Sequence, residues 1–293
     1  MNISSQSKED LLARALAIAN NLPPLSPLVR HFLETSSSHG DGPSVAEIAN
    51  SIEREPLITG RVLALANSAL YAQSVPILSV RVAVNQLGLD RLRQVVLGAS
   101  LNRLWSQVPT PAQWSTIRFT HHSIATALLS EMIASLVASQ EMELAFLAGL
   151  FHDTGRLIIA ILLHEDSEAL TRLSQDEHMA LEQIERELVG FSHSEISFAI
   201  ARSWNLPSPI EVAIRFHENP AEQPARLDLG RIPLSDIVHA ADRYVDWRGL
   251  SISGQMTKEE DKESALNELG IRAEHSSIFA RFQDEASVLL SIL

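Results

Sequence analysis

Apolar residues recur at intervals of three and four along almost the whole of this chain. Leu11, Leu12, Ala15, Leu16 and Ile18 show the spacing near the N-terminus. It places side chains on one face of an α-helix, which has about 3.6 residues per turn. No segment shows the sustained apolar and polar alternation of a half-buried strand. The periodicity therefore predicts an all-α fold, and 293 residues can supply sizeable cores.

The segment Gln107 to Trp114 (QVPTPAQW) contains two prolines and interrupts the helical pattern. The charge balance changes at the same place. Residues 1–110 carry 9 Lys+Arg against 8 Asp+Glu, whereas residues 111–293 carry 14 against 28. We therefore predict two packed helical subdomains, residues 1–108 and residues 109–293.

Several helices can be placed from the pattern. Strong helical periodicity covers Arg61 to Tyr71 and Leu87 to Leu104, and Ser44 followed by Glu47 is a capping-box signature. After a long polar connection, a short helix is expected from near Thr257. A final helix is expected from about Ser276 to the C-terminus.

The overall charge of −13 argues against binding to nucleic acid, because an acidic surface repels phosphate. Cysteine is absent, so the chain has neither disulfides nor thiolate ligands. The first twenty residues contain Lys8, Glu9, Asp10 and Arg14, which interrupt any apolar signal segment. The central apolar run Leu157 to Leu163 is too short to span a bilayer. We expect a cytoplasmic protein with neither a nucleic-acid nor a membrane partner.

Histidine and aspartate residues occur in apolar surroundings at several points of the chain. The clearest is Leu147 to Arg156 (LAGLFHDTGR), where burying the ionisable pair is costly unless it is paired or bound to metal. Imidazole and carboxylate groups at helix ends can surround a transition-metal ion. The residues with this potential are His121, His122, His152, Asp153, His193, His217 and Asp242.

The order His122, His152-Asp153, Asp242 resembles the H…HD…D pattern of the HD superfamily of metal-dependent phosphohydrolases. The resemblance implies that these four residues hold a metal ion in an all-α fold. His193 and His217 match further histidines of members with two or more metals, as possible second-site ligands. Many such members have another histidine after the position of His217, where this chain has Glu218.

The remaining motifs resemble one branch, the HDOD (HD-related output domain) family. The resemblance covers about residues 15–220, through NLPPLSPLVRHFL, ANSALY, LGLDRLR, AFLAGLFHDTGRLII and GFSHSEI. It implies a regulatory module of bacterial signal transduction, generally regarded as acting without catalysis. With no room for another sizeable domain, the chain resembles a standalone HDOD protein.

Three functional hypotheses follow from these features. The leading one is a signalling module that contacts other signalling proteins and binds a divalent metal (iron, manganese, zinc or nickel), or a phosphorylated or nucleotide ligand. The alternative is a metal-dependent phosphohydrolase in which Asp153 and Arg156 are catalytic, with Arg156 holding phosphate. A third is a structural adaptor with an empty pocket.

Two features of the sequence disfavour catalysis. Active members commonly have lysine at the position of Arg156, and residues 9 to 257 contain no lysine. Arginine holds phosphate well, but its pKa is too high for proton transfer. The GYP motif of cyclic-di-GMP phosphodiesterases of this superfamily is also missing.

Overall fold

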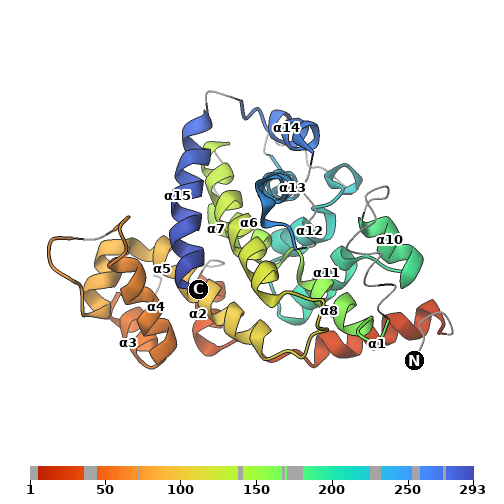
Figure 1. Cartoon of the computed structure of the whole chain (residues 1–293), viewed down its shortest axis with the longest axis horizontal. Coiled ribbons are helices and arrows are strands. Elements are labelled where there is room, and N and C mark those ends of the chain that lie inside the picture. The colour runs from red at the N-terminus through yellow and green to blue at the C-terminus, as the bar shows by residue number, and fades with distance from the viewer. Residues whose placement is uncertain are drawn as a thin grey trace. The chain divides into compact units, whose positions relative to one another are not determined.

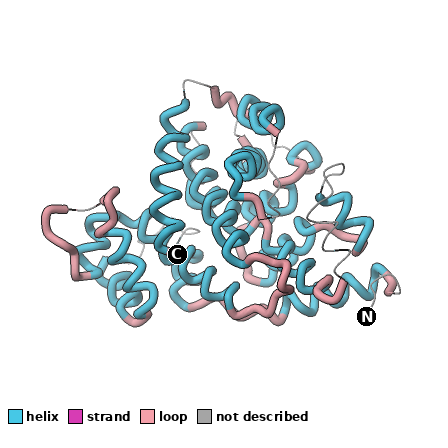
Figure 2. Tube along the Cα trace, viewed as in Figure 1, coloured by secondary structure: helices cyan, strands magenta, loops and turns pink. Residues whose placement is uncertain are grey.

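The structure is a computed structural model that describes most of the chain. It covers residues 6–35, 45–71, 73–137, 141–166, 169, 181–224, 232–252, 258–272 and 275–293. Throughout this part of the chain the regular elements are helices, and no strand occurs (Figure 2). The prediction of an all-α fold is confirmed.

The helices form two compact units, and neither unit is continuous in sequence. Unit one combines Met1–Pro23 with Val108–Glu274, and unit two combines Pro24–Gln107 with His275–Leu293. The boundary between the predicted subdomains, 1–108 and 109–293, lies next to the point at which the chain passes from unit two to unit one, between Gln107 and Val108. The predicted subdomains differ from the two units at both termini, because the first helix belongs with the later part of the chain and the last helix with the earlier part.

Unit one holds the predicted site residues. Its α-helices, labelled in Figure 1, are α1 (Lys8–Asn20), α6 (Thr116–Leu136), α7 (Met142–Phe151), α8 (Thr154–Leu162), α10 (Leu181–Leu188), α11 (His193–Ser203), α12 (Ser208–Phe216), α13 (Leu234–Val245) and α14 (Glu259–Glu268). Two short elements accompany them, the 3-10 helix η2 (Pro220–Glu222) and the π-helical turn η3 (Asp246–Leu250). Helices α6 and α7 pack side by side, and α12 and α13 pack against α7. This four-helix core positions the site.

Helix α1 belongs to unit one because its apolar face packs against the core of that unit. Leu11, Ala15 and Ala19 are buried in one cluster with Ile158 and Ile196, among others, from α8 and α11. The periodicity of α1 shows that it has an apolar face. It does not show which distant helices cover that face. For this reason the predicted subdomain of residues 1–108 includes α1, whereas the structure groups α1 with unit one.

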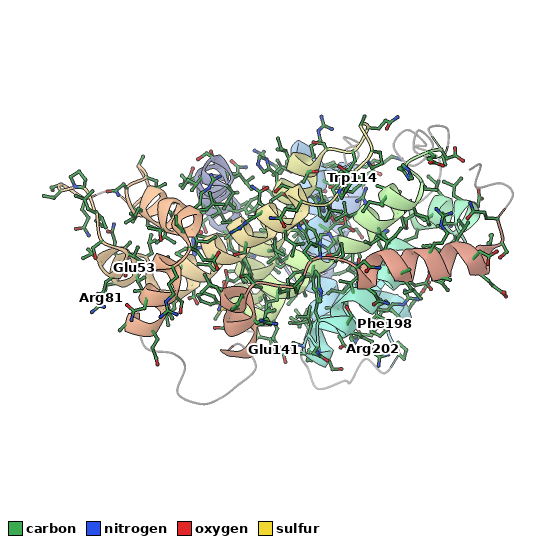
Figure 3. All side chains as sticks on the ribbon, turned by 90° about the horizontal axis from the view of Figure 1, so that it is seen from below. Glu53, Arg81, Trp114, Glu141, Phe198 and Arg202 are labelled. Atoms are coloured by element: carbon green, nitrogen blue, oxygen red, sulfur yellow. The ribbon has the colours of Figure 1, made fainter. Side chains whose placement is uncertain are left out.

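Helix α11 shows how one helix separates its two faces. Ser197 is buried, whereas Phe198 and Arg202 lie on its outer side, with the guanidinium 5.8 Å from the centroid of the Phe198 ring (Figure 3). The face of α11 that carries Ile196 and Ile200 is buried in the core of unit one, and the cation–π pair lies on the outer face.

The stretch Met142–Leu162 is the one described helical segment long and apolar enough, by length and composition, to cross a membrane. It corresponds to α7 and α8, and 83% of its apolar window is buried inside the protein. Packing against other helices accounts for this apolar composition. The cytoplasmic location stays a prediction.

Unit two consists of α2 (Pro27–Thr35), α3 (Val45–Glu53), α4 (Pro56–Ala66), α5 (Val80–Ser106) and α15 (Ser276–Ile292). Glu285 of α15 accepts a hydrogen bond of 2.7 Å from Arg91 of α5, and the side-chain amide of Asn102 donates to the carbonyl oxygen of Leu293 at 2.6 Å. Glu53 and Arg81 are exposed on this unit (Figure 3). The C-terminal helix is thus held by polar contacts with α5.

Some helix ends differ from the predictions. Helix α4 ends at Ala66, before the predicted end at Tyr71, and α5 begins at Val80, before the predicted start at Leu87. Gly88 has φ = 75° inside α5, and this kink interrupts the helix just after Leu87. The final helix begins at Ser276 as predicted, while Ser44 and Thr257 lie outside the described residues.

Asn67 explains the early end of α4. Its side-chain amide donates to the carbonyl oxygens of Leu63 and Ile77, at 2.9 and 2.8 Å, and its Oδ1 accepts from the N–H of Ile77 at 2.8 Å. Ile77 is buried, and the side chain of Asn67 supplies hydrogen-bond partners for both its N–H and its carbonyl oxygen. The asparagine of the ANSALY motif therefore fastens the loop that follows α4.

Replacing Asn67 by alanine should lower the free energy of unfolding by about 1–3 kcal/mol, because the buried backbone groups of Ile77 lose their partners. Chemical denaturation measures the change. Asn85→Ala is the control, since Asn85 is exposed on α5. Equal stability of the two variants would contradict the role assigned to Asn67.

Candidate metal centre

The structure brings all seven predicted site residues into one region of unit one. His122 comes from α6, His152 from the end of α7, and Asp153 from the turn before α8. The others are Arg156 on α8, His193 at the start of α11, His217 directly after α12, and Asp242 on α13. The exposed fractions of the four histidines and Asp153 are 2% or less. Residues that are far apart in sequence therefore form one buried cluster.

Small residues allow α6 and α7 to approach each other. A Cβ atom at Gly149 would lie 2.8 Å from Oγ of Ser130 and 2.9 Å from Cα of Ala127. A larger residue at this crossing would push the helices apart. His122 and His152 project from these two helices, and their Nε2 atoms lie 3.2 Å apart.

The glycine of the HDTGR motif has a related role. A Cβ atom at Gly155 would overlap the carbonyl group of His193. The N–H of Gly155 donates to Oγ of Ser197 at 2.7 Å. Helix α8 therefore touches α11 at the residue that begins α11, and this contact brings Asp153 close to His193.

Asp153 stands between two groups of ligand atoms. In the first half-site (His122, His152, Asp153 and Asp242), Oδ2 of Asp153 lies 3.4 Å from Nε2 of His122 and 3.5 Å from Nε2 of His152. Oδ1 of Asp242 lies 3.2 and 3.6 Å from the same two nitrogens. Two nitrogens and two oxygens thus face one another.

The second half-site (Asp153, His193, His217 and Glu218) uses the other oxygen of the shared aspartate. Oδ1 of Asp153 lies 3.2 Å from Nε2 of His193 and 3.7 Å from Nε2 of His217, and these nitrogens are 3.3 Å apart. Oε1 of Glu218 lies 3.6 Å from Nε2 of His193. Glu218, which stands where many members of the HD superfamily have a histidine, therefore reaches the cluster.

The hydrogen bonds of the four rings determine which nitrogen faces inward. Nδ1 of His152 lies 2.7 Å from the carbonyl oxygen of Gly149, and Nδ1 of His217 lies 2.8 Å from that of Ile214. Because a carbonyl group only accepts, each Nδ1 carries hydrogen and a neutral ring keeps its Nε2 lone pair. His122 and His193 likewise face outward with Nδ1, toward Leu250 and Glu185.

The carboxylates give the cluster a strong preference for positive charge. Burial alone would lower the pKa of His122, but Asp153, Asp242 and Asp246 outweigh it and hold that pKa well above its usual value. Burial would raise the pKa of Asp153, but Arg156 and the neighbouring histidines hold it well below its usual range. The field that retains protons on the imidazoles would equally stabilise a metal cation.

The donor set fits a transition-metal ion. Nitrogens bound to zinc at about 2.0–2.1 Å in a tetrahedron are about 3.3 Å apart, which matches the inward Nε2 pairs at 3.2 and 3.3 Å. Oδ1 of Asp153 is buried without a hydrogen-bond partner among the described residues. The close approach of the inward Nε2 atoms and this buried carboxylate oxygen are both explained by a cation between them.

The structure places Arg156 inside this arrangement. Its Nη1 donates to Oδ2 of Asp153 at 2.9 Å, and its side chain is 12% exposed. Arg243 donates to Oε2 of Glu218 at 2.7 Å. The neighbouring Thr154 donates its hydroxyl to the carbonyl oxygen of Phe151 at 2.9 Å, a bond back into the preceding helix. Arg156 and Arg243 thus each donate a hydrogen bond to a carboxylate of the cluster.

The sequence analysis missed Glu185 and Asp246, which contact His193 and His122. A signal for each was present. Glu185 is a charged residue on the face of α10 that carries Leu181 and Leu188, and it is buried. Asp246 follows Asp242 by four residues, which places the two on one helical face. A carboxylate on an apolar helical face is a mark of a buried polar site.

Comparison with known proteins identifies a family for most of the chain. The family model of the HDOD domain matches residues 22–220. An uncharacterized protein of Treponema pallidum (strain Nichols) is 23% identical over 221 residues, which are 74% of this chain and 42% of that protein. The chain therefore spans less than half the length of this curated relative.

Solved structures show the same fold. An HDOD domain protein of unknown function from Geobacter sulfurreducens has a TM-score of 0.74 and 24% identity, over 97% of each chain. A candidate phosphohydrolase from Shewanella amazonensis SB2B has a TM-score of 0.68 and 20% identity, over 96% of this chain and 97% of that chain. A candidate signal transduction protein from Marinobacter aquaeolei VT8 has a TM-score of 0.71 and 19% identity, over 100% of this chain and 68% of that chain. At these identities the likeness concerns the fold alone.

The contact at Gly155 can be tested by substitution. Gly155→Ala should lower the free energy of unfolding by about 1–3 kcal/mol, because the new Cβ meets backbone atoms of α11 that cannot move independently. Gly60→Ala is the matched control on α4, where a Cβ would meet nothing within 4 Å. It should raise stability by about 0.5–1 kcal/mol. Comparable destabilisation by both changes would disprove the specific contact.

Proposed function

Because this chain belongs to the HDOD domain family, we propose that it is a signal-transduction module whose HD-type cluster holds a divalent metal. The metal fixes the surface that other signalling proteins contact. The observation that supports the metal is the convergence of four Nε2 atoms on the two oxygens of Asp153. Iron, manganese, zinc and nickel all accept such ligands.

The protein's own residues would determine how the metal is held. His122, His152, Asp153 and Asp242 would bind one ion, and Asp153, His193, His217 and Glu218 a second. When bound, such a metal supplies Lewis acidity and positive charge. The helices that carry these side chains exclude water from the nitrogens, and the outward Nδ1 hydrogen bonds keep the rings oriented.

A regulatory role is supported by the state of Arg156. A residue that holds substrate phosphate must present its guanidinium group to the incoming anion. Arg156 instead donates to Asp153, so binding of phosphate would compete with a buried ion pair. Arginine also cannot release a proton at neutral pH. These features favour a metal that stabilises a conformation over one that turns over a phosphoester.

Purified protein, prepared without an affinity tag, should contain near-stoichiometric transition metal by elemental analysis. Asp153→Asn should lose most of it, because both half-sites depend on this carboxylate. The isosteric change limits packing effects in the metal-free protein. Asp90→Asn, on an exposed residue of α5, is the control and should keep wild-type metal content.

Two outcomes would contradict the metal proposal. Wild-type protein that stays free of metal after incubation with iron, manganese, zinc and nickel would identify the cluster as a proton-stabilised structural core. Equal metal content in wild type and Asp153→Asn would place the metal elsewhere. For the signalling role, partners captured by metal-loaded wild type should be lost with Asp153→Asn. Partner binding that is indifferent to metal would overturn that role.

A phosphohydrolase is the second candidate, and the partly exposed edge of the cluster favours it. The side chains of Asp246 and Glu218 are each 17% exposed, so one side of the ligand set borders solvent.

If this candidate is correct, metal-loaded wild type should hydrolyse bis(p-nitrophenyl) phosphate and Asp153→Asn should not. Arg156→Lys tests whether the chain lacks only a side chain that can transfer a proton. In that case the lysine variant should hydrolyse the substrate faster than the wild type. A loaded protein without turnover would eliminate the candidate.

A further inference from the structure

Two carboxylates outside the predicted ligand set each contact the outer nitrogen of one histidine. Glu185 accepts from Nδ1 of His193 at 2.8 Å. Oδ1 of Asp246 lies 3.3 Å from Nδ1 of His122. We propose that Glu185 and Asp246 are positioning residues, which orient His193 and His122 toward the centre and strengthen them as metal ligands. This inference rests on the proposed metal function.

The other two histidines are oriented by their own helices. Nδ1 of His152 and of His217 each faces the carbonyl oxygen three residues earlier, in Gly149 and Ile214. His193 is the first residue of α11, so no earlier turn of that helix can serve it. Its partner must therefore come from another element. Each half-site thus contains one histidine whose Nδ1 bonds within its own helix and one whose Nδ1 faces a carboxylate from another element, and Nδ1 of His122 also faces the carbonyl oxygen of Leu250.

The buried carboxylate of Glu185 makes two contacts with His193. It is 2% exposed, and an ionised carboxylate is costly to bury without strong partners. Its Oε2 accepts from both the backbone N–H and Nδ1 of His193, at 2.8 Å each. The first bond caps the start of α11 and the second orients the ring. A carboxylate behind a ligating imidazole makes the imidazole a better donor to metal.

Asp246 is the first residue of η3, and the next residue, Trp247, packs against α14. Lys262 of α14 lies with Nζ 3.9 Å from the centroid of the Trp247 ring, and Lys262 is 8% exposed. The turn also supplies the carbonyl oxygen of Leu250, 3.2 Å from Nδ1 of His122. Oδ1 of Asp246 is buried and makes no hydrogen bond among the described residues. His122 Nδ1 is the group it faces.

Cobalt(II) titration of the full chain, followed by visible absorbance, tests the proposal. Glu185→Gln and Asp246→Asn should each weaken cobalt binding about 10–100-fold. The pattern of cobalt bands should stay that of the wild type, because the number and type of ligands are unchanged. The metal-free variants should remain folded, because glutamine and asparagine keep a side-chain oxygen that can accept the same hydrogen bonds.

Matched controls lie on the same elements. Glu187→Gln changes an exposed carboxylate of α10, and Arg248→Ala changes an exposed residue of η3. Both should bind cobalt as the wild type does. If they weaken binding equally, the effect belongs to the helix or turn and the proposal is overturned.

The remaining outcomes each decide a different point. Wild-type binding together with unaffected Glu185→Gln and Asp246→Asn would overturn the positioning role and leave the metal function standing. Altered cobalt bands in Asp246→Asn would make Asp246 a direct ligand. Weaker binding in parallel with lower metal-free stability would reduce that residue to a structural role. No cobalt binding by wild type would overturn both proposals together.

Discussion

The carboxylate of Asp153 is the group on which the arrangement of unit one depends. It is 2% exposed, and its two oxygens face different pairs of histidines while Arg156 donates to one of them. A buried carboxylate needs such partners to offset its loss of hydration. Because the partners come from α6, α7, α8, α11 and α12, satisfying one aspartate requires these helices to converge. The small contacts at Gly149 and Gly155 make that convergence sterically possible.

The same arrangement links stability to function. In the absence of a cation, Nε2 of His122 and Nε2 of His152 lie 3.2 Å apart, and the neighbouring carboxylates hold the pKa of His122 well above its usual value. A metal would take the place of that proton, and its binding free energy would then stabilise the packing of the helices. This coupling gives a physical basis for the proposed regulatory role, which does not require bond cleavage.

Apolar periodicity was enough to predict the all-α class, and the resemblance to the HD superfamily selected His122, His152, Asp153 and Asp242 as a set. Two terminal helices were harder to place. Leu11 and Ala15 of α1 follow the helical period. Their partners on α8 are about 150 residues away in the chain, and a local pattern carries no record of such contacts. The end of α4 also depended on Asn67, and the interruption of α5 after Leu87 depended on Gly88; these effects are tertiary or conformational.

By itself, the sequence determined which residue types can bind metal and which segments are helical, because both follow from side-chain chemistry and local periodicity. Only the tertiary structure decided which atoms meet. It directed the two oxygens of Asp153 to different half-sites, turned Arg156 onto Asp153, and brought Glu185 to His193. These outcomes depend on packing between elements that are distant in sequence. Small residues at the crossings decide that packing, and their steric consequences appear only when the helices touch.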